Sequence, residues 1–254
     1  MVSLLQLDWP LLIAILSIML FAGLVHGTLG LGFPMVATPM LAVFFDVRTA
    51  ILITLLPTVA VNLASIWNSR NSLDSVGRFS LLIAFVLPGS LAGAYILAIA
   101  DPAPFRLALA GLIFLYLWTN ISGRLPRQWL VANVMLAMAL FGFAAGFAAG
   151  TTNVMVAILI VFFLSLEIPR SNMVPVLNAC FLVGKVSQIT VLSLLGLVTF
   201  TLLYETVPLA LAAVLALFFG QRIREKIAVE VYRHILHGLL VILAGVLVVQ
   251  FWTS

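Results

Sequence analysis

Long apolar runs separated by short charged loops make up most of this chain. A bilayer core needs about 20 apolar residues in α-helical form, so the pattern predicts ten membrane segments. Two are shorter than the core requires, and we interpret these, 31–45 and 152–166, as hairpin arms that need not cross fully. The expected segments are 9–26, 31–45, 49–68, 79–99, 104–121, 129–149, 152–166, 171–195, 198–220 and 232–252.

Composition agrees with this pattern. The chain is 64% hydrophobic and 8% charged, with a mean hydropathy of +1.28, whereas soluble domains carry about 25% charged residues. We therefore expect an all-α, polytopic membrane protein whose partner is the lipid bilayer. The start lacks the basic region of a cleaved signal peptide. The basic balance rests on few charges and indicates orientation in a membrane, with no nucleic-acid partner.

The positive charges predict an orientation. Cytoplasmic loops of membrane proteins are rich in Lys and Arg. With ten segments and both termini outside, the four basic loops all lie on the cytoplasmic side, whereas merging each short segment with its predecessor would separate them. Arg48 and Arg106 are exceptions, each close to an acid. The basic loops are 69–78, 122–128, 167–170 and 221–233.

The first apolar run contains residues that do not suit an unbroken helix. Gly27, Gly30, Gly32 and Pro34 lie in its middle. Non-helical backbone at membrane depth persists only where protein buries it or where it lines a wet cavity. This stretch is therefore either a tight turn between two helices or the lining of a site.

The two halves of the chain resemble each other. Ala22–Thr28 aligns with Ala145–Thr151. Each copy is followed by a short apolar arm, an acid-containing turn and a long helix with a proline. Five segments per half is an odd number, so the second repeat, 126–254, would be inverted relative to the first, 1–125, within one membrane domain. Inverted repeats with interrupted segments indicate a transporter site near the midplane.

Polar side chains follow one face of each proline-containing helix. At 100° per residue, the spacings within each set place its members on a shared stripe. One interpretation is a wet cavity between the two helices, and the other is hydrogen bonding that merely holds helices together. We favour the cavity. The stripes consist of Thr54, Thr58, Asn62, Ser65 and Ser69 in one helix, and of Ser171, Asn178 and Lys185, with Gln188 beside them, in the other.

Lys185 lies in the middle of its segment, too deep for its ammonium group to reach the interface. A charge at that depth costs at least ~2.5–3.5 kcal/mol. Three interpretations remain: Lys185 is deprotonated, it pairs with a distant acid such as Glu167 or Glu205, or it faces a cavity that holds an anion.

Two expected helix starts add a second feature that attracts anions. The arm after Gly32 begins with unpaired N–H groups and the positive end of a helix dipole. The second arm is expected to open with Thr151, Thr152 and Asn153 as N-cap residues. The two starts could converge on one anion. His26, at the first turn, either donates or titrates there, or is satisfied by the backbone.

The other motifs exclude several functions. The sequence has no H-E-x-x-H, no G-x-S-x-G, no phosphate-binding P-loop and no pair of carboxylates within a segment. Cys180 is the only cysteine, which excludes an intrachain disulfide and a cysteine-based metal cluster. We expect no enzyme, no cofactor and no metal. Glycines four apart, such as Gly142, Gly146 and Gly150, predict close helix packing.

The stretch A-G-x-x-x-G-x-x-G-x-G-F-P-x-x-x-T-P-x-L from Ala22, followed by a D-x-R-x-A turn at Asp46, resembles the sulfite exporter TauE/SafE family. The resemblance covers the layout of the whole chain and is specific mainly in Gly23–Ala50. It implies a carrier of sulfur-containing anions or carboxylates in the bacterial cytoplasmic (inner) membrane. The second half departs from the family's G-x-G-G-P-like repeat, with Gly150–Asn153 and no proline.

These observations predict a secondary transporter of small anions with alternating access around a midplane site. Coupling to protons through His26 is a further hypothesis. The alternative is a non-transporting membrane assembly or interaction protein, whose polar stripes hold helices together. The expected substrate-binding residues are His26, Gly30, Gly32, Asn62, Thr151, Thr152, Asn153, Asn178, Lys185 and Gln188.

Overall fold

The computed structural model describes residues 4–68, 74–121, 127–224 and 229–253, and these residues form helices joined by short turns. Each of the ten expected segments coincides with helical residues, and segment 129–149 is divided between two helices, Arg127–Ala132 and Val134–Thr152. The 3₁₀-helix η1 and the α-helices are η1 Leu4–Gln6, α1 Trp9–Leu29, α2 Phe33–Ala42, α3 Val47–Asn68, α4 Asp74–Arg78, α5 Ser80–Ile99, α6 Ala103–Ile121, α7 Arg127–Ala132, α8 Val134–Thr152, α9 Val156–Ser165, α10 Arg170–Leu194, α11 Phe200–Arg224 and α12 Val229–Thr253.

Helix length distinguishes the helices that can span a membrane from the two short arms. Within the described residues, seven helices are long and apolar enough to cross a membrane. The helices α2 and α9 have ten residues each, so they rise only about 15 Å, half the thickness of a bilayer core. The chain is thus a multi-pass membrane protein. Its exposed surface agrees, because large apolar side chains such as Phe200 and Leu194, 84% and 82% exposed, face outward.

Both short arms follow a break in the backbone. Helix α1 ends at Leu29, three residues later than predicted, and the chain turns through Gly30 (φ 76°) and Gly32 (φ 102°). These left-handed conformations suit glycine, which has no Cβ. Helix α8 ends in the same way at Asn153, with φ 69°, because asparagine tolerates the left-handed region better than most residues.

The prediction that Thr151, Thr152 and Asn153 open the second short arm as N-cap residues was wrong. Thr151 and Thr152 form the last turn of α8, and Asn153 is its C-cap, while Met155 precedes the first residue of α9. These three residues therefore do not open the arm as N-caps. The sequence Gly150–Asn153 suits a helix end as well as a helix start, because Thr and Asn are tolerated at both.

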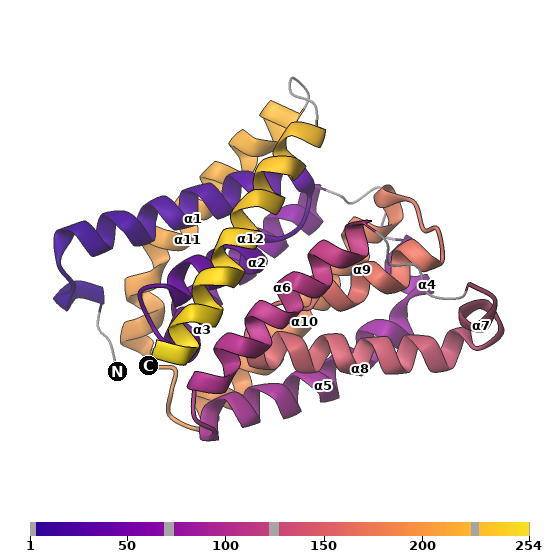
Figure 1. The fold of residues 1–254 in the computed structure, drawn as a ribbon, viewed down its shortest axis with the longest axis horizontal. Helices are drawn as coiled ribbons and strands as arrows, with labels where there is room; N and C mark the ends of the chain where they lie inside the picture. The colour runs from indigo at the N-terminus through magenta and orange to yellow at the C-terminus, as the bar shows by residue number, and fades with distance from the viewer. Residues whose placement is uncertain (1–3, 69–73, 122–126, 225–228, 254) are drawn as a thin grey trace.

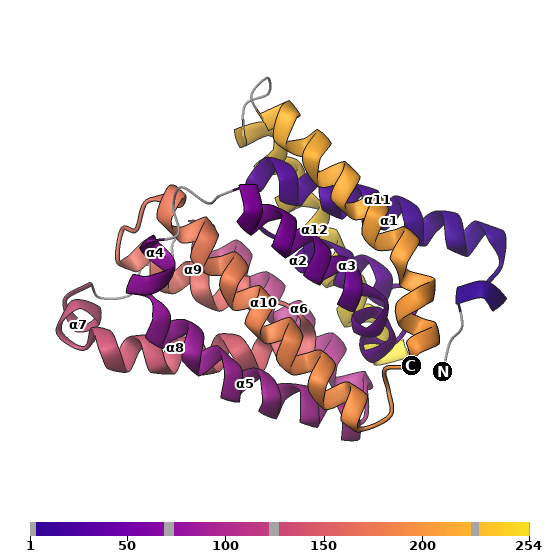
Figure 2. The same ribbon diagram turned by 180° about the vertical axis from the view of Figure 1, so that it is seen from behind.

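The first long helix of each half of the sequence packs against a helix of the other half. Helix α1 packs along α11 from the second half, and α8 packs along α5 from the first half (Figures 1 and 2). Glycines make both crossings close. A Cβ on Gly93 would lie 2.4 Å from the Phe147 carbonyl oxygen, and one on Gly220 would lie 2.4 Å from that of Leu24. The prediction that spaced glycines serve helix packing is confirmed.

The long polar helices α3 and α10 lie beside each other, with α5 and α11 packed on their outer sides. Helices α6 and α12 also pack together, across one face of the molecule (Figure 1). The α3–α10 contact is therefore in the interior, where the largest buried side chains, such as Phe162 and Phe163, also lie.

Both termini lie at one end of the molecule (Figure 1). The Leu4 N–H donates to Glu205 Oε2 at 2.7 Å, and Gln250 Nε2 donates to the Val43 carbonyl oxygen at 3.0 Å. Three of the basic loops include Arg70, Arg124 and Lys226, which lie outside the described residues, as does Ser69.

Candidate functional site

The first break in the membrane segments is organised around His26. The side chain is fully buried, and its Nδ1 accepts a hydrogen bond from the Phe33 N–H at 3.3 Å. Phe33 is the first residue of α2, so this bond ties the end of α1 to the start of the arm. The neutral ring then carries its proton on Nε2. His26 thus has a backbone partner at one nitrogen and a donor left over at the other.

Asn178 of α10 connects this break to the polar stripe of α3. Its Nδ2 donates to the Gly30 carbonyl oxygen at 3.3 Å, to Ser65 Oγ at 3.2 Å and to the Val174 carbonyl oxygen at 2.9 Å. One side chain therefore holds α1, α3 and α10 together at the first break. We refer to His26, Asn62, Ser65 and Asn178 as the first centre.

Several polar atoms near the first centre are unpaired. Buried atoms with no hydrogen-bond partner among the described residues cost about 1–3 kcal/mol each. Most buried polar groups in proteins are paired, so a cluster of unpaired atoms indicates a place where a ligand or water binds. The unpaired atoms of this cluster are His26 Nε2, Thr58 Oγ1, Asn62 Oδ1 and Asn178 Oδ1.

The second break is organised around Lys185 and Gln188. The Lys185 side chain, 2% exposed, donates from Nζ to Gln188 Oε1. Gln188 Nε2 in turn donates to the carbonyl oxygens of Gly150 at 2.9 Å and Ala149 at 3.2 Å. These carbonyls belong to the last turn of α8. A cation next to the negative end of a helix dipole is stabilised, which supplies a structural reason for the position of Lys185.

Asn153 completes the second centre, which we define as Lys185, Gln188, Asn153, Thr38 and Thr54. Asn153 Nδ2 donates to Thr38 Oγ1 at 2.8 Å and to Thr54 Oγ1 at 3.1 Å. The contact joins the second break to α2 and α3. Sequence reasoning did not assign Thr38 to the site, although Thr38 is the threonine of the T-P pair in the stretch from Ala22 that carries the family resemblance.

The stripe of α3 is buried over its described length, and it links the two centres. Thr54 contacts Asn153 of the second centre, while Ser65 contacts Asn178 of the first. The stripe of α10 is shorter than expected. Asn178, Lys185 and Gln188 are buried, but Ser171 is exposed at the start of the helix.

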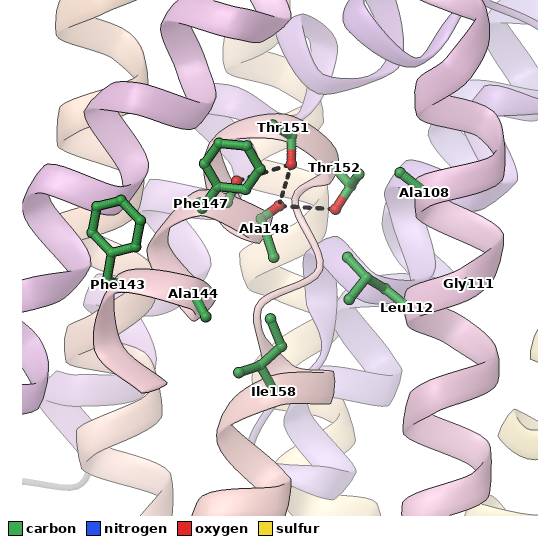
Figure 3. A pocket seen from close by; sticks show the side chains of 10 residues that line it. All are labelled: Ala108, Gly111, Leu112, Phe143, Ala144, Phe147, Ala148, Thr151, Thr152 and Ile158. Atoms are coloured by element: carbon green, nitrogen blue, oxygen red, sulfur yellow. Dashed lines mark hydrogen bonds between the residues drawn. The ribbon is translucent and has the colours of Figure 1, made fainter. Parts of the chain in front are cut away.

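Thr151 and Thr152 have a different environment from the one expected. Their hydroxyls donate to carbonyls of their own helix, Phe147 at 2.9 Å and Ala148 at 2.8 Å respectively. Both line an apolar cavity of about 650 Å³ between α6, α8 and α9 (Figure 3). Its walls are mainly apolar side chains, such as Phe143 and Leu112. The two threonines are therefore separated in role from the two polar centres.

The glycines divide into two kinds. Gly30 and Gly32 require left-handed backbone, as the interruption in the sequence suggested. Gly27 and Gly150 are helical and serve packing instead, because a Cβ there would lie 2.1 Å from the Leu217 carbonyl oxygen or 2.5 Å from the Ala94 nitrogen.

The buried side chains of the described chain include one amine, that of Lys185, and no carboxylate. The carboxylates that we considered as partners lie elsewhere, with Glu167 exposed in the turn before α10 and Glu205 bonded to the N–H of Leu4. The described residues contain no group of His, Cys, Asp and Glu suited to hold a metal ion.

Interrupted helices around a buried polar strip characterise this multi-pass helical membrane protein. The profile of the sulfite exporter TauE/SafE family matches residues 15–247, and the chain belongs to this family. It is a family of membrane transporters, as the resemblance of Gly23–Ala50 implied. Comparisons with curated proteins and with solved structures gave no match.

Proposed function

We propose that this protein is a secondary transporter of a small sulfur-containing anion or short carboxylate in the bacterial inner membrane, with both termini outside. The observation that carries the proposal is the buried Lys185 side chain, in an interior without a buried carboxylate among the described residues. An unpaired charge inside a membrane protein marks a substrate or ion pathway. An anion beside a protonated Lys185 would neutralise its charge, and no buried carboxylate among the described residues does so.

The proposed site lies between α3 and α10, bounded by the two breaks. The ammonium of Lys185 supplies attraction, while the Thr58 hydroxyl and His26 Nε2–H are unpaired donors for anionic oxygens. Of the ten expected binding residues, we keep His26, Asn62, Asn178, Lys185 and Gln188 as ligand contacts. We assign Gly30, Gly32 and Asn153 to shaping the breaks, and Thr151 and Thr152 to the apolar cavity.

Alternating access in this proposal rests on two inverted repeats, about 1–125 and 126–254. The two close helix crossings, α5 with α8 and α11 with α1, support the repeats. Gly93 of α5 contacts Phe147 and Gly150 of α8. Gly220 of α11 contacts Leu24 and Gly27 of α1. Leu24 and Gly27 align with Phe147 and Gly150 in the sequence. Because α1 packs on α11 and α8 packs on α5, the bodies that move against each other around the site are bundles that each contain helices of both halves.

Uptake into proteoliposomes tests the proposal. We expect the purified protein to move sulfite, a sulfonate or a short carboxylate down its gradient. Lys185→Met should reduce uptake at least tenfold, because the attraction for the anion is lost. Arg222→Met, which removes an exposed cation from the end of α11, is the matched control and should keep uptake near the wild-type rate.

The competing function is a non-transporting membrane assembly protein. It predicts that none of these anions moves or binds, whatever the variant. Unchanged uptake by Lys185→Met in an active protein would instead keep transport and remove Lys185 from the site. Proton coupling through His26 is part of the proposal, and an imposed proton gradient that leaves the uptake rate unchanged would contradict it.

A further inference from the structure

The apolar cavity beside the second break has an exposed rim and a buried floor. Its volume of about 650 Å³ falls within the range of about 300–1,000 Å³ that is typical of ligand pockets. Gly111 of α6 and Phe143 of α8 are exposed at the rim, whereas Thr152 at the floor is fully buried. Figure 3 shows the wall from α6 facing the walls from α8 and α9, with the two threonines at the turn between α8 and α9. The cavity therefore leads from the outer surface of the molecule to the end of α8.

Both hydroxyls at the floor of the cavity already have hydrogen-bond acceptors. Thr152 donates to the Ala148 carbonyl oxygen at 2.8 Å, and Thr151 donates to the Phe147 carbonyl oxygen at 2.9 Å. The other lining residues carry apolar side chains or none, and none of the ten is charged. A polar ligand would lose its hydrogen bonds to water in such a place and gain none in return. The lining therefore selects an apolar occupant.

The rim of the cavity lies at the depth of the lipid acyl chains. Phe143 is the middle residue of α8, a helix long and apolar enough to cross the membrane, and Gly111 lies near the middle of α6. The exposed face of α8 continues beyond the cavity with Leu136 and Leu140, which are 53% and 52% exposed. Lipid headgroups begin about 15 Å from the middle of a hydrocarbon core that is about 30 Å thick. The surface around the rim is therefore continuous with the surface that contacts the hydrocarbon chains of the bilayer.

We propose that this cavity is a binding site for one acyl chain of a bilayer phospholipid, which enters at the rim and reaches the last turn of α8. A free fatty acid would bring its carboxylate into a site whose lining residues include no cation, and an unpaired charge is costly to bury. The charged headgroup of a phospholipid instead stays at the membrane surface while its chain fills the cavity. The phospholipid is therefore the occupant that fits both the lining and the depth of the rim.

The acyl chain supports the last turn of α8 from a different face than the second centre does. Ala148 and Thr152, four residues apart, share the face that lines the cavity. The carbonyl oxygens of Ala149 and Gly150 in the same turn accept from Gln188 at 3.2 and 2.9 Å. Occupancy of the cavity thus stabilises the end of α8 without entering the polar strip. The inference is independent of the proposed transport function.

Photo-crosslinking tests whether a lipid chain reaches the floor. The purified full-length protein is placed in nanodiscs of phosphatidylcholine that carries a diazirine group in one acyl chain, and labelled residues are identified by mass spectrometry. We expect labels on Ala148, Thr151 or Thr152, which are at most 5% exposed and are shielded from lipid at the outer surface. Labels confined to exposed residues such as Leu136 and Leu140 would overturn the proposal.

A bulky side chain in the cavity should exclude the acyl chain. Gly111→Phe suits this test because a Cβ at Gly111 has nothing within 4 Å, and Ala144→Phe approaches from the facing wall. We expect either variant to lower labelling of the floor about tenfold, since two groups cannot share one space without strain. Gly245→Phe is the matched control. Gly245 is exposed on α12, has nothing within 4 Å of its Cβ and does not line the cavity, so labelling should be unchanged.

Thermal unfolding in detergent provides a second measurement that does not depend on crosslinking chemistry. A ligand that binds only the folded protein raises its apparent stability. Added phosphatidylcholine should therefore raise the unfolding midpoint of the wild type and of Gly245→Phe, and it should raise that of Gly111→Phe less. An equal response of all three proteins would contradict the proposal.

Other occupants of the cavity give different results. If a fatty acid with the same diazirine group labels the floor and the phospholipid does not, the occupant is a free fatty acid and the proposal is overturned. If no lipid labels the floor and the protein is a dimer whose protomers cross-link at Phe143 or Phe147, a second copy of the chain covers the cavity, which also overturns the proposal. Anion transport is tested separately by uptake, so its failure and the failure of this inference are distinguishable.

Discussion

The side-chain amide of Asn153 donates a hydrogen bond of 3.1 Å to the hydroxyl of Thr54, joining the break after α8 to the middle of α3. The same amide donates to Thr38 at 2.8 Å. One residue thus sets the end of α8 through its left-handed backbone and holds α2 and α3 through its side chain. Because the two roles use different atoms, they can be separated by mutation.

Asn153→Gly keeps the left-handed backbone and removes both hydrogen bonds, so we expect a loss of about 1–3 kcal/mol in stability. Asn153→Ala removes the same bonds and adds about 1–2 kcal/mol, since alanine disfavours φ 69°. Thermal unfolding in detergent should therefore rank wild type above Asn153→Gly and Asn153→Gly above Asn153→Ala. Equal stability of the two variants would show that the backbone at residue 153 is not strained.

The close glycine crossing of α1 and α11 makes Gly27 intolerant of a side chain. A Cβ at Gly27 would lie 2.1 Å from the Leu217 carbonyl oxygen, and relieving such overlap typically costs 1–3 kcal/mol. Gly27→Ala should lower the thermal midpoint and the yield of folded protein. Gly238→Ala is the control, with nothing within 4 Å of its Cβ, and it should raise stability by up to about 1 kcal/mol through helix propensity.

Gly150→Ala tests the corresponding crossing of α8 and α5. Its Cβ would lie 2.5 Å from the Ala94 nitrogen and 2.6 Å from the Ser90 carbonyl oxygen. We expect a destabilisation close to that of Gly27→Ala, because the two contacts are alike. A variant as stable as wild type would mean that the α5–α8 crossing opens easily, and it would weaken the case for two equivalent crossings.

Arg48, an exception to the charge pattern, binds the end of a helix. Its guanidinium donates to the carbonyl oxygens of Leu97 and Ala100 at the end of α5. The nearby acid, Asp46, accepts a hydrogen bond from the Thr49 N–H at 3.0 Å. Arg48 and Asp46 therefore each bond to backbone groups. Arg48→Met should lower stability by about 1–3 kcal/mol, measured by thermal unfolding, while the exposed Arg222→Met should leave it within ±0.5 kcal/mol.

The expected orientation places Trp252 outside and Arg78 inside. In a Cys180→Ala background, single cysteines at these two exposed positions should react from opposite sides of the membrane. A membrane-impermeant maleimide applied to intact cells should label Trp252→Cys, and it should label Arg78→Cys only after permeabilisation. Labelling of both from outside would refute the ten-segment arrangement.

The sequence by itself determined the membrane class, the ten apolar segments and the two interruptions. Hydropathy and helix-breaking glycines act locally, so a run such as Phe33–Ala42 forms a short helix wherever it packs. The sequence also predicted the buried polar strip of α3, because residues on one helical face, such as Thr54 and Asn62, share their environment. The family resemblance rested on the same local pattern.

The tertiary structure decided which side chains and helices contact each other. Whether Asn153 begins one helix or ends another depends on a backbone angle that packing against Thr38 and Thr54 helps to select. Lys185 could have met a distant acid, and only the folded chain places it beside Gln188 and the last turn of α8. Likewise, the exchange of α1 and α8 between the halves joins residues far apart in sequence. Contacts of this kind depend on three-dimensional geometry, which local patterns of polarity do not encode.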